Sequence, residues 1–161
     1  MKKIKVTKKD LRNLHAIFEQ IDNKVMNKDY IEFCFRNKKL TEVEKELLEA
    51  QFKKTEEEQA YLESEWTLLN KYGIKDKNGN LRFPVIVPSE SEEEFNAEYA
   101  KLQKENEEIY NKLIEKNEEE ATELAKEIEI ELHTIDFEKV PDEIVGTAYN
   151  LLRECELIIV K

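Results

Sequence analysis

The chain has 161 residues, about the length of one domain, and a domain of this size can bury a core without a metal or a disulfide. Charged residues make up 39% of it and the formal net charge is −11, which argues against direct binding to nucleic acid. The two cysteines, Cys34 and Cys155, are far apart in apolar surroundings. This placement excludes a disulfide framework and predicts buried free thiols in a reducing compartment.

The ends of the chain contain no pattern typical of export or of a membrane anchor. Residues 1–6 are basic, but no apolar segment follows them as it would in a signal peptide. The longest uninterrupted apolar run, residues 157–160, is far too short to cross a bilayer. We therefore expect a cytoplasmic protein with no membrane partner.

Residues 1–40 predict a basic strand-helix-helix segment. The alternation Lys-Ile-Lys-Val over residues 2–7 favours a short strand. Thr7 is a suitable N-cap for a helix that reaches about Val25, with Asp10 three residues after the cap. A second helix is expected over residues 29–37, ended by Asn37-Lys38-Lys39.

Residues 41–128 predict a long antiparallel helical hairpin. Thr41 and Glu44 form a capping box that opens a helix to about Tyr72, and Gly73 ends it. The apolar stripe of this helix contains Val43, Leu47, Leu48, Phe52, Leu62, Trp66 and Leu69. Residues 74–88, with the turn pair Asn78-Gly79, predict a β-hairpin at the tip, and a second helix runs from Ser89 or Ser91 to about residue 128.

Polar residues interrupt both predicted stripes. Thr55 and Gln59 fall on the first stripe, and Asn106 and Asn117 on the second. The asparagines either fix the register of the hairpin or mark a loosely packed middle.

The last part of the chain, residues 129–161, predicts a strand-helix-strand segment. Ile128, Ile130 and Leu132 alternate with acidic residues, as in a half-buried strand that continues to Phe137. A helix is expected after Pro141, and residues 157–160 are a final strand, placed provisionally beside the N-terminal one. Together these elements predict one predominantly helical α+β domain over residues 1–161, with a small sheet formed by the terminal strands and the strand after the hairpin.

The charge is distributed unevenly along the chain. Residues 1–40 hold eleven Lys or Arg against five acids, whereas residues 89–131 hold five against sixteen. The simplest interpretation of the acidic part is a solvated helix face. The alternative is a surface for a basic partner, including a nucleic-acid mimic, because a strong negative field speeds association with positive surfaces. The candidate partner-binding residues are Glu92, Glu93, Glu94, Glu105, Glu108, Glu118, Glu119, Glu120 and Glu123.

No residue pattern predicts catalysis, a cofactor or a metal site. The two histidines, His15 and His133, have no metal-ligand spacing on their own elements and are expected to be structural or on the surface. The chain has three glycines, too few for a phosphate-binding loop, and Asp76–Asn80 lacks the ligand offsets of a calcium loop. We therefore expect a protein that is not an enzyme.

The order of the elements resembles a family of small proteins of unknown function encoded by tailed phages and prophages of Gram-positive bacteria. The stretches that match are Lys71–Asn80, Glu94-Phe95 and Glu127–Leu132. The resemblance implies no catalytic residues, and it implies a phage protein in the cytoplasm of its host. The Pro84–Pro88 segment and the helix after it exceed the shorter members of the family.

Two functions are consistent with these features. The first is a non-catalytic accessory factor that engages a protein partner through the acidic helical face, for example to inhibit a host nucleic-acid-binding or defence protein. The second is a virion or tail assembly component that associates with itself. An enzyme with an unrecognised site is a distant third.

Overall fold

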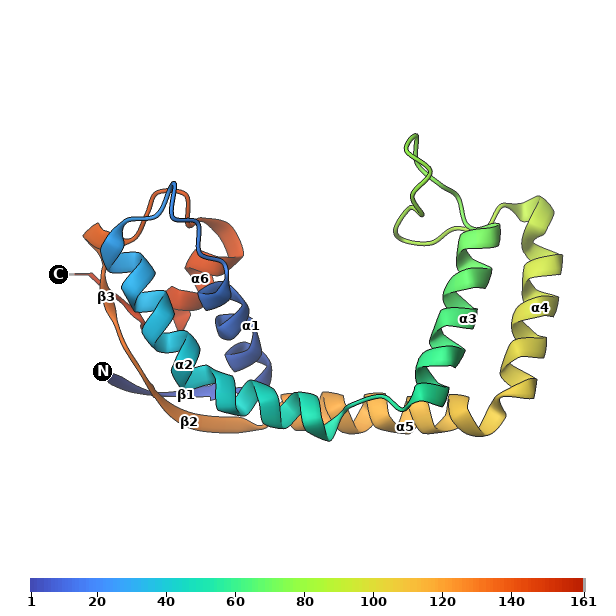
Figure 1. The fold of residues 1–161 in the computed structure, drawn as a ribbon, viewed down its shortest axis with the longest axis horizontal. Coiled ribbons are helices and arrows are strands. Elements are labelled where there is room, and N and C mark those ends of the chain that lie inside the picture. The colour runs from blue at the N-terminus through green and yellow to red at the C-terminus, as the bar shows by residue number, and fades with distance from the viewer. Residues whose placement is uncertain (161) are drawn as a thin grey trace. The chain divides into compact units, whose positions relative to one another are not determined.

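The computed structural model describes residues 1–160 and confirms a mainly helical α+β fold (Figure 1). The elements are β1 (Lys2–Thr7), α1 (Lys8–Glu19), α2 (Lys28–Gln51), α3 (Glu56–Tyr72), η1 (Ser89–Ser91), α4 (Glu92–Glu105), α5 (Glu107–Leu124), β2 (Glu127–Leu132), β3 (Ile135–Asp136), η2 (Phe137–Lys139), α6 (Gly146–Glu154) and β4 (Ile158–Ile159). Within the described residues, no helix combines the length and apolar character that crossing a membrane requires.

The chain packs as two compact units. Unit 1 contains Met1–Phe52 and the chain from Glu119 onward, and unit 2 contains Lys53–Glu118. These boundaries differ from the expected segment boundaries at residues 40 and 128. Two units can still belong to one domain, so a single domain over residues 1–161 stays a prediction.

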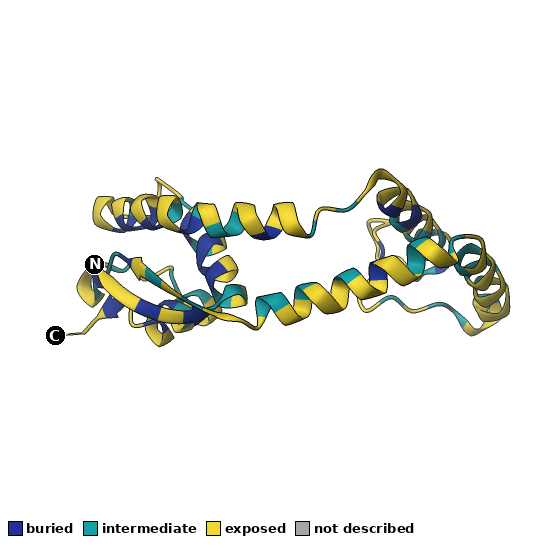
Figure 2. Cartoon of the chain, turned by 90° about the horizontal axis from the view of Figure 1, so that it is seen from below, coloured by how far each residue is buried: buried dark blue, intermediate teal, exposed yellow. Residues whose placement is uncertain are grey.

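The core of unit 1 lies between α1, α2, α6 and the short strands. Figure 2 shows many of the buried positions in the part of the chain that holds both ends. The largest fully buried side chains include Tyr30, Phe18, Leu11, Leu14, Leu132, Leu152 and Leu157. Thr7 caps α1 as predicted, because its Oγ1 accepts a hydrogen bond from the Asp10 amide at 3.1 Å. The helix ends at Glu19, earlier than predicted.

Two small sheets complete unit 1. β1 and β2 pair antiparallel, with Lys2 opposite Leu132 and Thr7 opposite Glu127. β3 and β4 pair in parallel through Ile135 and Ile158. The last strand therefore lies beside the strand after the hairpin, and its expected place beside the N-terminal strand was wrong. The final helix also begins later than expected, at Gly146.

Helix α2 is continuous where the sequence predicted a break. The sequence predicts a helix end at Asn37 and a helix start at Thr41, yet both residues are fully buried inside α2. The Asn37 side chain accepts from the His133 amide at 2.8 Å and donates to the His133 carbonyl at 3.0 Å. The polar residues at positions 37 and 41 therefore attach α2 to its neighbours, and they leave the helix intact.

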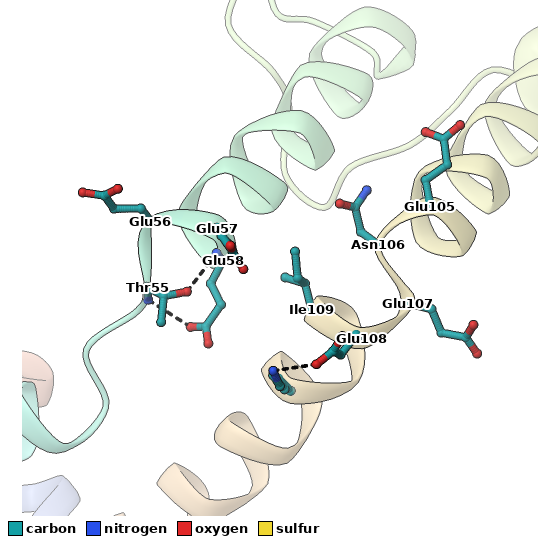
Figure 3. A pocket seen from close by; sticks show the side chains of 10 residues that line it. Thr55, Glu56, Glu57, Glu58, Glu105, Asn106, Glu107, Glu108 and Ile109 are labelled. Carbon is teal, nitrogen blue, oxygen red and sulfur yellow. Dashed lines mark hydrogen bonds and ion pairs between the residues drawn. The ribbon is translucent and has the colours of Figure 1, made fainter.

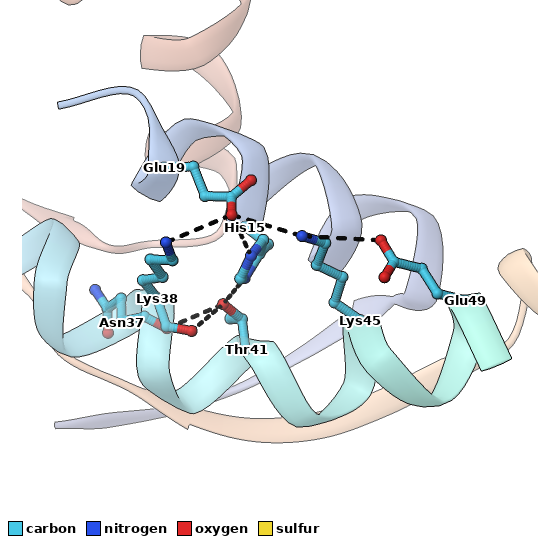
Figure 4. Close-up of polar contacts among 7 residues, drawn as sticks. All are labelled: His15, Glu19, Asn37, Lys38, Thr41, Lys45 and Glu49. Carbon is cyan, nitrogen blue, oxygen red and sulfur yellow. Dashed lines mark hydrogen bonds and ion pairs between the residues drawn. The ribbon is translucent and has the colours of Figure 1, made fainter.

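A buried polar cluster joins α1 to α2 (Figure 4). His15 Nδ1 lies 2.7 Å from Thr41 Oγ1, and both side chains are almost inaccessible to solvent. Thr41 Oγ1 is also 3.0 Å from the Asn37 carbonyl oxygen. At the edge of this cluster Glu19 Oε1 lies 3.5 Å from Nζ of both Lys38 and Lys45. His15 thus has a structural position, as expected.

The two cysteines are buried free thiols, as the sequence predicted. Burial raises the pKa of the Cys34 thiol to about 11, and burial likewise raises the pKa of Cys155 to about 11. The reactive thiolate is therefore scarce at neutral pH.

Unit 2 contains the antiparallel helix pair α3 and α4. The ring centroids of Tyr72 and Phe95 are 5.8 Å apart, and the Tyr99 hydroxyl donates a hydrogen bond to Glu65 at 3.2 Å. The end of α3 therefore lies beside the start of α4, as it must when the two helices run antiparallel. Each predicted long helix is broken, however. The first is interrupted between α2 and α3, where Thr55 forms a capping box with Glu58, and the second at Asn106.

The segment between α3 and α4 is a structured loop with much less strand than the predicted hairpin. One bridge pairs Lys75 with Leu81, and the predicted turn is present, because Gly79 with φ of +81° donates to the Asp76 carbonyl at 3.1 Å. Leu81 is buried beside Gly73. Gly73 ends α3 as expected, but its φ of −70° is open to any residue. The position requires glycine because a Cβ would lie 2.6 Å from the Leu69 carbonyl oxygen and would also collide with Leu81 Cδ1.

Several residues of the predicted apolar stripe are on the surface. Val43, Leu47 and Trp66 are exposed by 61%, 59% and 48%, whereas Leu48 is buried. The predicted stripe assumes a single helix. The break at residues 52–55 divides it between α2 and α3, so its two halves do not form one continuous face.

Candidate functional site

The predicted acidic residues lie on α4 and α5 and are divided between the two units. Glu92, Glu93 and Glu94 occupy the first turn of α4, and Glu105 and Glu108 lie on either side of the α4–α5 break. Glu118 ends unit 2, whereas Glu119, Glu120 and Glu123 belong to unit 1. The helix breaks also explain part of the acidic pattern, because carboxylates in a first helical turn interact favourably with the helix dipole.

In unit 1 the acidic residues pair with the basic N-terminal segment. Lys8 Nζ lies 2.5 Å from Glu123 Oε1, and Lys126 Nζ lies 2.6 Å from Glu123 Oε2. Arg12 reaches Glu120 at 3.4 Å. These two glutamates are therefore at least partly neutralised within the chain.

The β1–β2 sheet continues the same pairing. Lys3 Nζ lies 2.6 Å from Glu129, and Lys5 Nζ lies 2.6 Å from Glu127. The hydrogen bond from Lys3 lowers the pKa of Glu129. The basic N-terminal segment and the acidic later segment, which the sequence shows as a contrast in charge, thus largely pair with each other within unit 1.

Unit 2 holds ten Lys or Arg against sixteen Asp or Glu. Several of its acidic side chains surround one cavity (Figure 3). The cavity has a volume of about 570 Å³. It lies where the first turn of α3 meets the α4–α5 break, and we call it the acidic pocket. Its lining residues are Thr55, Glu56, Glu57, Glu58, Glu105, Asn106, Glu107, Glu108, Ile109 and Lys112.

Cations of unit 2 already neutralise some of these carboxylates. Glu58 is buried, and Lys116 Nζ lies 2.8 Å from its Oε2. The hydrogen bond from Lys116 lowers the pKa of Glu58, and that from Lys112, at 2.9 Å, lowers the pKa of Glu108. Lys101 is 3.9 Å from Glu105.

Three carboxylates of the acidic pocket remain available, namely those of Glu56, Glu57 and Glu107. Among residues 1–160, no Lys, Arg or His nitrogen lies within 4.0 Å of them. Figure 3 shows Ile109 pointing into the cavity and Glu56 and Glu107 turned outward at its rims. The Ile109 side chain suits the aliphatic stem of a Lys or Arg side chain, and the surrounding carboxylates suit its charged head.

Sequence reasoning found Glu105 and Glu108 but missed Glu56, Glu57 and Glu107. The signal was present in Thr55-x-x-Glu58, a capping-box pattern that lay inside a helix predicted to be continuous. In the described part of the chain, no group of three or more His, Cys, Asp or Glu side chains is arranged to hold a metal ion.

Comparisons with protein-family models, with curated proteins and with solved structures find no match to this chain.

Proposed function

We propose that the protein is a non-catalytic binding factor whose acidic pocket receives Lys or Arg side chains of a protein partner. The observation that carries the proposal is the set of three carboxylates without an ion pair, Glu56, Glu57 and Glu107, around one cavity that Ile109 also lines. The net charge of unit 2 adds a long-range attraction for basic surfaces. In a phage-encoded protein, one form of this function is the occupation of the basic surface of a host nucleic-acid-binding or defence protein.

The test compares two triple variants with the same change in charge. Glu56→Gln/Glu57→Gln/Glu107→Gln alters the pocket, whereas Glu92→Gln/Glu93→Gln/Glu94→Gln alters the exposed first turn of α4. Both sets lie in first helical turns, so both lose a similar helix-dipole interaction. The probe is a fluorescein-labelled octapeptide of alternating Lys and Arg, and its fluorescence anisotropy is measured at about 0.15 M salt, where distant charges are screened.

We expect the pocket variant to weaken peptide binding by about tenfold and the α4 variant to change it little, as three modest charge contacts imply. Equal losses in both variants would show that only net charge attracts the peptide, and the pocket would then not be a site. Far-ultraviolet circular dichroism of each variant confirms that the helices are retained.

A second candidate function, self-association, is favoured by an exposed stripe on α2. Leu40, Val43 and Leu47 are exposed by 37%, 61% and 59% and follow the three- and four-residue spacing of a coiled-coil seam. Sedimentation velocity over a concentration series tests this function. A dimer that Val43→Asp/Leu47→Asp abolishes would support it, and a wild-type monomer at every concentration would reject it.

A further inference from the structure

Unit 2 carries an exposed pair of aromatic rings that the acidic pocket does not involve. Trp66 on α3 and Phe83 in the loop stack with centroids 6.0 Å apart and planes 14° apart. Phe83 is 71% exposed, and Ile86 of the same loop is 56% exposed. Large apolar side chains grouped on a surface are typical of binding sites, and Trp is prominent among the residues that dominate interface energy. We call Trp66 and Phe83 the aromatic platform.

The loop that carries the platform is held in a defined conformation. The Ile74 amide donates to the Ile86 carbonyl at 2.9 Å, and the Arg82 amide donates to the Ile74 carbonyl at 3.0 Å. Leu81 is buried against the position of Gly73 at the end of α3. The exposed side chains are therefore presented by an ordered segment, which lowers the entropic cost of binding.

The same loop is cationic within an acidic unit. Lys75, Lys77 and Arg82 have no carboxylate within 4.0 Å anywhere in residues 1–160, although carboxylates outnumber cations in unit 2. The one acid of the loop, Asp76, is engaged in the turn, where its Oδ1 accepts from the amides of Asn78 at 2.8 Å and Asn80 at 3.0 Å. Three unpaired cations thus accompany the aromatic platform.

We propose that the aromatic platform docks an acidic protein segment. An aromatic or aliphatic side chain of the partner covers Trp66 and Phe83, and its carboxylates meet the three loop cations. Charge complementarity favours this occupant over a basic segment. A short acidic segment also fits better than a nucleic acid, because a polyanion extending beyond the loop meets the carboxylates of α3 and α4. The inference is independent of the acidic pocket.

The chain itself supplies the readout, because Trp66 is its single tryptophan. The probe is a twelve-residue peptide of Glu, Leu and Phe without tryptophan. Three comparison ligands are the same peptide with Lys in place of Glu, a peptide of Glu and Ser, and a twelve-nucleotide oligothymidylate. We expect the acidic apolar peptide alone to shift Trp66 emission to shorter wavelength saturably and to protect it from acrylamide quenching.

Variants separate the apolar and the charged contributions. Phe83→Ala should weaken binding of the acidic apolar peptide by about tenfold, as for a central interface residue. Lys75→Gln/Lys77→Gln/Arg82→Gln should weaken it by a similar factor at low salt and by less at high salt. The matched control Lys53→Gln/Lys101→Gln/Lys104→Gln removes three cations of unit 2 outside the loop and should leave the affinity within about twofold.

Several outcomes would overturn the inference. One is the absence of any emission change with the acidic apolar peptide, and another is an equal loss of affinity in the loop and control variants. Tighter binding of oligothymidylate would assign the platform to single-stranded nucleic acid. A shift of Trp66 emission with protein concentration alone, abolished by Phe83→Ala, would assign it to a second copy of the chain.

Discussion

Glu58 in the first turn of α3 and Lys116 in α5 form the most buried ion pair of unit 2, with Oε2 and Nζ 2.8 Å apart. Lys116 also donates to the carbonyl of Lys53 at 3.3 Å, just before α3. Glu58 meanwhile closes the capping box with Thr55. One carboxylate therefore both starts a helix and attaches it to another.

The first prediction concerns acid stability. The hydrogen bond from Lys116 lowers the pKa of Glu58 below its ordinary value of 4.5, so the unfolded chain binds its proton more readily than the folded chain does. The stabilisation is therefore present above that ordinary value and is lost as the pH falls through the lower, folded-state pKa. We expect Glu58→Gln to lower the free energy of unfolding at pH 7 and to flatten its decline below about pH 5.

Urea denaturation at pH 3 to 7 measures both effects, with Glu57→Gln as the control. A decline as steep in Glu58→Gln as in the wild type would contradict this account.

The second prediction separates structural from available glutamates in unit 1. Glu123 pairs with Lys8 and Lys126, whereas Glu119 is exposed and makes no such pair. We expect Glu123→Gln to lower the melting temperature more than Glu119→Gln does, because only the former leaves the partly buried Lys8 ammonium without its partner. Differential scanning calorimetry of the two variants tests this order. Equal melting temperatures would mean that the Lys8 pair contributes nothing.

The main elements were predictable from the sequence because they depend on local patterns. The alternation in residues 2–7 and the Thr7 cap fix β1 and the start of α1, and the Asn-Gly turn at residue 79 depends on local backbone preference. The helical character of the middle of the chain follows in the same way. These features need no knowledge of the tertiary structure.

The predicted helix boundaries are wrong where contacts between residues distant in sequence decide whether a helix continues. Asn37 and Thr41 look like helix boundaries, but the backbone of His133 and the ring of His15 satisfy them inside α2. Thr55 looks like a polar interruption within one continuous helix. The structure shows instead that the helix does end before it, and Thr55 caps the next helix. Since the acidic pocket is built from two helix breaks, Glu56 and Glu57 could not be placed beside Glu107 until both breaks were known.

The third prediction tests the buried polar cluster. Thr41→Val keeps the shape of the side chain and removes the hydroxyl, which leaves His15 Nδ1 buried without its 2.7 Å partner. We expect a loss of about 1 to 3 kcal/mol in the free energy of unfolding. Guanidinium denaturation gives the value.

The control Thr67→Val removes an exposed hydroxyl on α3 and should change stability by less than about 0.5 kcal/mol. A Thr41→Val change as small as that of the control would show that the cluster is not stabilising.

The fourth prediction concerns the close approach at Gly73. Adding a methyl group places a Cβ against Leu81 Cδ1 and 2.6 Å from the Leu69 carbonyl oxygen. We expect Gly73→Ala to cost about 1 to 3 kcal/mol and to move Trp66 emission, because the loop that carries Phe83 must shift. Denaturation followed by tryptophan fluorescence measures both effects, with the exposed Ser64→Ala as control.

A double variant separates that collision from a general effect of alanine at the helix end. Gly73→Ala/Leu81→Ala should cost less than the two single variants together, since removal of the leucine side chain relieves one of the two close contacts of the new Cβ. Strict additivity of the two free energies would place the cost elsewhere.

The order of the elements sets the sequence of events during synthesis. β1 is synthesised well before its partner strand, because Lys2 pairs with Leu132, about 130 residues later. At about 5 to 20 residues per second, the opening strand waits on the order of ten seconds for its partner. All of unit 2 is made during that interval. The whole middle of the chain is therefore synthesised before β1 can find its partner, and β1 stays unpaired throughout that time.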